Sequence, residues 1–255
     1  MSPIARALLF AAANLLHPRM LWLMVWPMLL ALVAWGVAAI ALWGRTTVWL
    51  ADHFRQWAAS GVFLVRFEAG DAMLVAAHIF LLLLFVPAVW LTALLILSVF
   101  GMPVMVEHVA QRHFAGLARR RGGGFAGSAW NGVVALAGLA ALALVSIPFW
   151  LVPPLWPLIP VAIMGWLNQR VLRYDALAEH ASADEMRQIF SFRRRTLYTM
   201  GAILALLAYV PLVGFVAPVL FGLAFIHLLL GELQALRNAP IEGEVVRAEV
   251  LPRAE

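Results

Sequence analysis

Long uncharged runs alternate with short polar segments along most of the chain. The first two runs cover residues 20–43 and 72–102, and each exceeds the roughly 20 residues that a helix needs to cross a bilayer. Trp22, Trp26 and Trp43 lie towards the two ends of the first run, where aromatic belts occur in membrane helices. The pattern therefore predicts two full transmembrane helices.

Two later apolar runs, 130–167 and 197–230, share a different plan, because prolines interrupt the middle of each. A continuous helix over 197–230 would be about 50 Å long, against about 30 Å of hydrocarbon, whereas residues 197–210 alone reach only about 21 Å. Such lengths favour a helical hairpin, half-penetrating or short-spanning, over one long kinked helix. The predicted break residues are Pro148, Pro153, Pro154 and Pro157 in the first hairpin, and Pro211, Gly214 and Pro218 in the second. Pro211 is expected to end one short helix and Pro218 to open the next.

The polar segments complete the predicted architecture. Residues 3–17 read as an amphipathic interfacial helix, with a cleaved signal peptide as the alternative. Residues 44–71 read as a polar connection with a short helix, and 103–121 as an amphipathic helix that continues from the second span. Residues 1–237 are expected to form a single membrane domain, followed by a polar, disordered tail at 238–255.

The distribution of arginine predicts the topology. Arg45, Arg55 and Arg66 lie in the 44–71 connection. If the N-terminus is cytoplasmic and both hairpins return to their side of entry, every other arginine faces the cytoplasm, in agreement with the positive-inside rule. We therefore expect both termini to lie in the cytoplasm.

Composition strengthens the membrane assignment. The chain is 64% hydrophobic and 12% charged, with a mean hydropathy of +0.92, whereas a soluble domain is about half apolar and about a quarter charged. The absence of cysteine excludes disulfides, zinc–thiolate sites and thiol chemistry. The net charge of +5 could suggest nucleic acid as a partner. The arginines lie at the ends of apolar segments, however, so we expect the lipid bilayer and no nucleic acid.

Candidate chemistry is sparse. HExxH, GxSxG, P-loop and GxGxxG motifs are absent, so we expect no enzyme activity, no metal and no cofactor. His108 and His113 resemble a metal box only superficially, because residues five apart lie on different helix faces. His78 and His227 lie in or near apolar runs, and we interpret them as neutral side chains bonded to a neighbouring helix.

The segment before the second hairpin carries the clearest polar signal. Ser182 and Glu185 have capping-box spacing, which predicts a helix start. Arg193, Arg194 and Arg195 follow at the expected membrane face. These cations could anchor lipid phosphate or receive a small anion, and the N-terminus of the next helix would assist in either role.

The stretch "YDALAEHASADEMRQIFSFRRRTLYTMG", followed by "YVPLVGFVAPVLFG", resembles the C-terminal half of the CysZ-type sulfate permeases, within the etoposide-induced-protein-like membrane family. Gly214 stands where that family has asparagine, and Arg19 stands near the place of its Gly-X-Arg-Arg motif. The matching residues are Tyr174, Glu185, Met186, Arg187, Arg193, Arg194, Gly201, Pro211 and Pro218.

The resemblance implies an inner-membrane homo-oligomer with two full spans and two hairpins, which passes sulfate. The resulting hypothesis is a transporter or channel-like protein for a small anion, sulfate first, with Arg19, Arg193 and Arg194 as candidate anion-binding residues. A non-transporting membrane scaffold or membrane-shaping protein of the same family is the alternative, and a membrane enzyme is the third possibility.

Overall fold

The computed structural model describes residues 2–59 and 70–238, which contain helices and no strand. Four of the described helices are long and apolar enough to cross a membrane. The all-α, polytopic membrane fold is therefore confirmed. The chain divides into two compact units, of which unit 1 comprises Met1–Met20 and Met102–Glu255, and unit 2 comprises Leu21–Gly101. The predicted tail lies outside the described residues except for its first residue.

Unit 2 is built from α2 (Pro18–Ala59) and most of α3 (Gly70–His113). The short helix predicted within the polar connection is present, but it is the end of α2. The predicted separation from the first span is therefore wrong as far as residue 59. No proline follows Gly44 in this part of α2, and Asp52 pairs with Arg55 one turn later at 2.8 Å. Such i,i+3 pairs support a helix where the apolar pattern ends.

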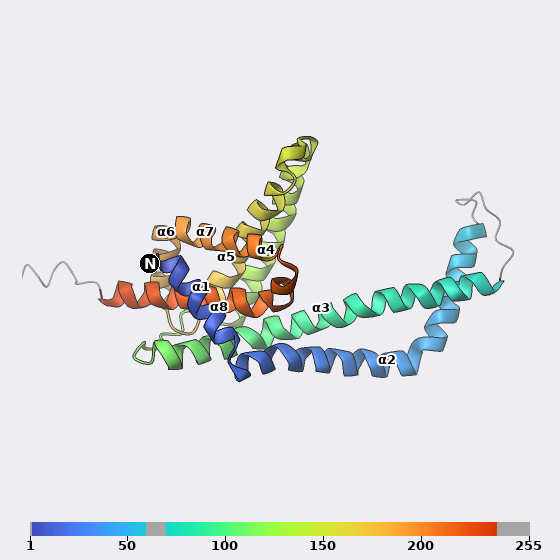
Figure 1. Ribbon diagram of the computed structural model, residues 1–255, viewed down its shortest axis with the longest axis horizontal. Helices are drawn as coiled ribbons and strands as arrows, with labels where there is room; N and C mark the ends of the chain where they lie inside the picture. Colours follow the sequence, from blue (N-terminus) through green and yellow to red (C-terminus); the bar gives the residue numbers. More distant parts are fainter. Residues whose placement is uncertain (1, 60–69, 239–255) are drawn as a thin grey trace, which may run out of the picture. The chain divides into compact units, whose positions relative to one another are not determined.

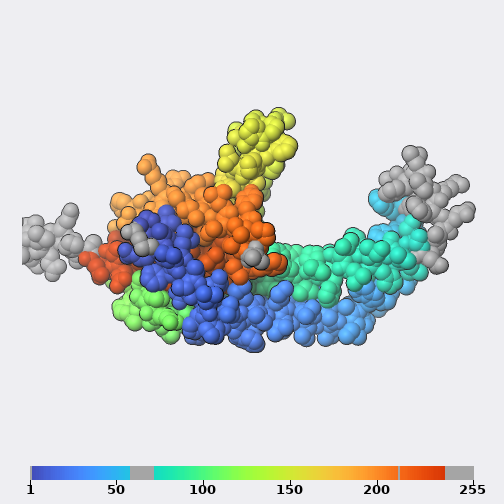
Figure 2. Space-filling model, viewed as in Figure 1, coloured from blue at the N-terminus to red at the C-terminus, as the bar shows by residue number. Residues whose placement is uncertain are grey.

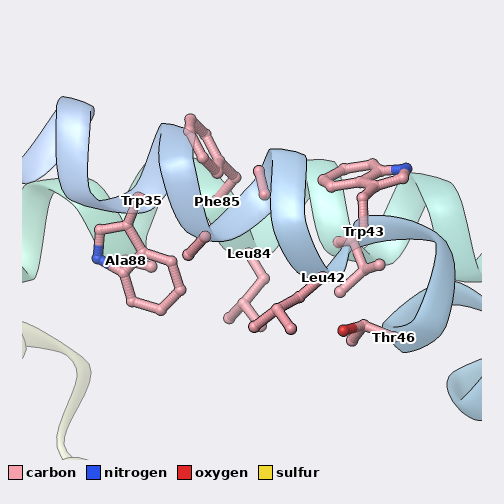
Figure 3. A pocket seen from close by; sticks show the side chains of 10 residues that line it. Trp35, Leu42, Trp43, Thr46, Leu84, Phe85 and Ala88 are labelled. Atoms are coloured by element: carbon pink, nitrogen blue, oxygen red, sulfur yellow. The ribbon is translucent and has the colours of Figure 1, made fainter.

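The two helices of unit 2 contact each other mainly through aromatic side chains. The indole Nε1 of Trp35 donates to Thr92 Oγ1 at 2.9 Å, and the rings of Phe54 and Phe80 meet edge to face at 5.9 Å. Between the helices lies a hollow of about 130 Å³, which Figure 3 shows lined by large apolar side chains with Thr46 at one end. Unit 2 thus offers an apolar surface and almost no polar chemistry.

The predicted amphipathic helix 103–121 does continue from the second span, but it ends early, at His113. Residues 120–123 leave the helix and pair with the turn at 178–181, where Gly122 N–H donates to Ala181 O at 2.8 Å. A Cβ on Gly122 would lie 2.5 Å from that oxygen, so this close approach requires glycine.

The first predicted hairpin consists of α4 (Phe125–Ser146), two short 3-10 turns and α5 (Leu158–Leu177). The turns, η1 (Ile147–Leu151) and η2 (Pro153–Leu155), form a tip that Figure 2 shows in yellow. The side chain of Leu151 at the tip is among the most exposed in the described chain. Pro148, Pro153, Pro154 and Pro157 all lie between the two helices, as predicted.

The second break is shorter than predicted. After α6 (Ala183–Phe192), α7 (Arg194–Leu207) ends three residues before α8 (Pro211–Asn238) begins. Pro211 therefore opens a helix instead of ending one, and Gly214 and Pro218 lie inside α8. Proline in a helix interior costs about 3 kcal/mol, which packing along the rest of the helix can offset.

Helix α8 forms the centre of the buried core of unit 1. Its side chains from Leu223 to Leu230 are nearly all fully buried, and α1 (Pro3–Leu15) crosses it in Figure 1. The second hairpin is open, because α7 packs chiefly against α5 and not against α8. At that contact a Cβ on Gly201 would lie 2.2 Å from Gly165 O, so the two backbones touch.

Candidate functional site

A polar hollow of about 470 Å³ lies within unit 1, where α1, α8 and the end of α3 meet the junction of α6 and α7. We call it the arginine–histidine hollow. Its apolar lining includes Phe10, and its charged and polar lining comprises Arg6, His113, Arg193, His227, Glu232 and Gln234. It is the described cavity in which basic side chains from several helices converge.

Arg193 enters this hollow from the junction of α6 and α7. It ends α6 and precedes the first residue of α7, so local helix capping fixes its backbone. Its Nε donates to Glu232 Oε2 at 2.8 Å. The Arg193 side chain is 52% exposed and that of Glu232 only 10%. Glu232 therefore uses one edge of the guanidinium, and the other N–H groups of Arg193 face space that an anion can enter.

The second cation, Arg6, comes from α1. Arg6, Phe10 and Asn14 recur at helical spacing and share one face of that helix. Sequence reasoning assigned Arg6 only to membrane topology and missed its place at the hollow. The signal that could have found it is Asn14, a polar residue on the buried face of an otherwise apolar helix.

Asn14 joins three helices through contacts with residues that line the hollow. Its Nδ2 donates to Phe10 O at 2.9 Å and lies 3.1 Å from His227 Nε2 and 3.4 Å from His113 Nε2. The His113 and His227 rings lie 4.8 Å apart, and Phe10 stacks on His227 at 5.1 Å. His227 is thus bonded to a neighbouring helix, as the sequence predicted.

The other two predicted anion-binding arginines do not line this hollow. Arg19 is exposed at the start of α2, where its backbone N–H donates to His17 Nδ1 at 3.2 Å. Arg194 is exposed as the first residue of α7. The structure therefore brings one of the three predicted residues to the hollow and adds Arg6 to it.

A second polar network in unit 1 connects the end of α8 to the start of α6 and to Arg120. Arg237 donates to both carboxylate oxygens of Glu185, at 2.9 and 3.0 Å, and to the backbone oxygen of His180 at 2.7 Å. Arg120 donates to the same carboxylate at 2.9 Å. The Arg237 hydrogen bonds lower the pKa of Glu185 to about 2. Ser182 and Glu185 form the predicted capping box, so this prediction is confirmed.

In the described part of the chain, no group of three histidine, aspartate or glutamate side chains is placed to hold a metal ion. The arginine–histidine hollow instead offers two guanidinium groups, two imidazoles and one carboxylate. Guanidinium groups bind tetrahedral oxyanions through paired N–H donors. The arrangement suits anion binding, and one charge is already neutralised by Glu232.

Comparison with known proteins places the chain in a family. The model of the family described as "Sulfate transporter CysZ/Etoposide-induced protein 2.4" matches residues 7–218. No curated protein and no solved structure matches the chain. The match covers most of the chain, from residue 7 within α1 to residue 218 within α8, so Arg6 lies just before its start. The protein therefore belongs to the Sulfate transporter CysZ/Etoposide-induced protein 2.4 family.

Proposed function

We propose that this membrane protein is a transporter or channel for a small anion, with sulfate the first candidate. The observation that carries the proposal is the convergence of Arg6 and Arg193 on one hollow in a chain of this family. An arriving oxyanion would bind the N–H groups on the free edge of the Arg193 guanidinium. It would compete with Glu232 for the Nε–H group on the other edge. No covalent step is needed.

The predicted location supports the same function. We propose that the protein lies in the bacterial inner membrane, as its resemblance to the CysZ-type permeases implies. We also propose that both termini are cytoplasmic, because the arginine distribution follows the positive-inside rule. The exposed apolar faces of α2 and α3 contact lipid, and we propose that copies of the chain assemble into a homo-oligomer. Native mass spectrometry from detergent would reveal a single subunit if the assembly does not form.

The test of transport is sulfate entry into proteoliposomes. We expect the purified protein to raise uptake of labelled sulfate well above that of empty liposomes. We also expect it to rescue growth of a bacterial strain that lacks its own sulfate importers. Background uptake by correctly inserted protein, together with no rescue, would reject the function.

A non-transporting membrane scaffold or membrane-shaping protein is the second candidate, and the Arg193–Glu232 pair favours it. A paired guanidinium attracts a dianion less strongly than a free one. The exposed hairpin tip at 147–157 would then insert into lipid to shape the bilayer. Altered vesicle curvature on reconstitution, with no sulfate flux, would support this candidate over transport.

A further inference from the structure

Three arginines outside the hollow gather where α5, α6 and α7 meet. The close contact between Gly165 and Gly201 fixes the register of α5 against α7. Arg173 lies about two turns beyond this contact along α5, and Arg194 lies about two turns before it along α7. The Arg173 guanidinium lies over the ring of Phe190 in α6, which precedes α7, so α5 runs antiparallel to the α6–α7 segment. The charges of Arg170 and Arg194 both act on Arg173, so each of these two cations lies near it.

None of the three arginines has a carboxylate partner among the described residues. Arg173 Nη1 donates to Gln169 Oε1 at 3.1 Å, and its guanidinium lies 4.6 Å from the centre of the Phe190 ring. Arg170 Nε is buried without a hydrogen-bond partner. Arg173 is therefore held by neutral contacts, and no carboxylate compensates the charge of Arg170 or Arg173.

The acid of α5 does not supply the missing charge. Asp175 accepts a hydrogen bond from the Ser128 hydroxyl at 2.6 Å, which directs it towards α4. Burial raises the pKa of Asp175, whereas burial and the two neighbouring arginines lower the pKa of Arg173 to about 10. A partly buried cation that neighbouring cations repel and that lacks a counter-ion is stabilised when an anion binds beside it.

We propose that Arg170, Arg173 and Arg194 form a binding site for a tetrahedral oxyanion, either free sulfate or phosphate or the phosphate of a lipid headgroup. Guanidinium groups from two helices present several N–H donors, which suits a tetrahedral oxyanion better than a halide. Arg194 also opens a 14-residue helix, whose first-turn N–H groups and dipole favour negative charge at that end.

This site is separate from the arginine–histidine hollow. Arg193 points to Glu232 in the hollow, whereas the adjacent Arg194 acts on Arg173 of α5. The site goes beyond the proposed transport function, because it would hold an anion even if the protein passed none across the membrane. Binding and flux can therefore be tested independently.

The test measures binding to the full-length protein in detergent by isothermal titration and thermal shift. Sodium sulfate and sodium phosphate are compared with sodium chloride at matched ionic strength. A second arm adds phosphatidic acid to the micelles, with phosphatidylcholine as the uncharged comparison. Stabilisation by sulfate or phosphate identifies a free anion, and stabilisation by phosphatidic acid alone identifies a lipid phosphate.

The variants decide whether these arginines carry the binding. We expect Arg173→Gln to lower the affinity for whichever ligand stabilises the wild type by about tenfold or more. Arg173→Lys should fold normally and retain part of that affinity. Arg187→Gln is the matched control, because Arg187 is exposed and pairs with Asp184 on α6. No binding by the wild type, equal binding by Arg173→Gln, or an equal loss in Arg187→Gln would overturn the proposal.

Discussion

The central helix of unit 1, α8, and the two helices of unit 2 are similarly apolar but buried to very different extents. In the most apolar stretch of α8, 61% of residues are buried inside the protein, against 17% in α2 and 6% in α3. The hollow of unit 2 is lined almost wholly by apolar side chains, whereas that of unit 1 contains arginine, histidine and glutamate. Hydropathy alone therefore does not separate a lipid-facing helix from the core helix of a polar site.

The largest effect should come from emptying the core of α8. Phe225→Ala removes a fully buried ring from unit 1 and should cost about 3–5 kcal/mol of stability. Leu83→Ala in α3 is the matched control in unit 2, because the Leu83 side chain is 70% exposed and should cost far less. Denaturant titration in detergent, followed by tryptophan fluorescence, checks both. Equal losses would refute the contrast in packing.

A single methyl group should distinguish the units nearly as well. Gly201→Ala places a Cβ 2.2 Å from Gly165 O, so α5 and α7 must separate, at a cost of about 1–3 kcal/mol. A Cβ on Gly36 in α2 would meet nothing within 4 Å. Gly36→Ala should therefore be neutral or stabilise by up to about 1 kcal/mol. Thermal unfolding of both variants gives the comparison, which fails if Gly201→Ala is tolerated equally well.

Acid should weaken unit 1 through Glu185. The Arg237 hydrogen bonds lower its pKa from 4.5 to about 2 in the folded protein, so the carboxylate stabilises the fold fully above about pH 4.5. That stabilisation is lost as the pH falls from 4.5 towards 2, because the unfolded chain takes up the proton first. We expect Glu185→Gln to have a lower Tm than the wild type at pH 6. We also expect its Tm to fall less steeply between pH 4.5 and 2, because the Glu185 carboxylate is gone. An unchanged slope of Tm against pH between 4.5 and 3 would contradict the assignment.

The smallest effect should come from the polar contact within unit 2. Thr92→Val removes the acceptor of the Trp35 indole N–H while keeping the side-chain shape. Hydrogen bonds between membrane helices contribute about 0.6 kcal/mol on average, so the change in stability should stay below about 1 kcal/mol. The shift in the denaturation midpoint measures it, and a loss comparable to that of Phe225→Ala would show that unit 2 depends on this bond.

Much of the fold was predictable, because hydrophobic run length and proline position are local signals. They located the apolar helices and the first break, and the spacing of Ser182 and Glu185 located the capping box. The second break was placed too late, since Pro218 is kept helical by burial of the rest of α8, which is a tertiary effect. The continuation of α2 to residue 59 was missed because polar residues in an exposed helix resemble a connection.

The site was only partly predictable, since it depends on which helices meet. The cluster of arginines identified Arg193, yet nothing local indicated that Glu232, thirty-nine positions later, would pair with it. The same cluster sends Arg193 and Arg194 to different surroundings, because successive helical residues point in different directions. The contacts of Asn14 with His113 and His227 likewise depend on the approach of α1 to α8.

The most direct test of the central claim is the initial rate of labelled sulfate entry into proteoliposomes with the hollow altered. The double variant Arg193→Gln/Glu232→Gln removes the cation without leaving a buried carboxylate unpaired, and Arg187→Gln removes an exposed cation elsewhere. We predict a loss of about tenfold or more in the double variant and a near wild-type rate in the control. Equal rates in all three proteins would contradict a role for the arginine–histidine hollow in anion passage.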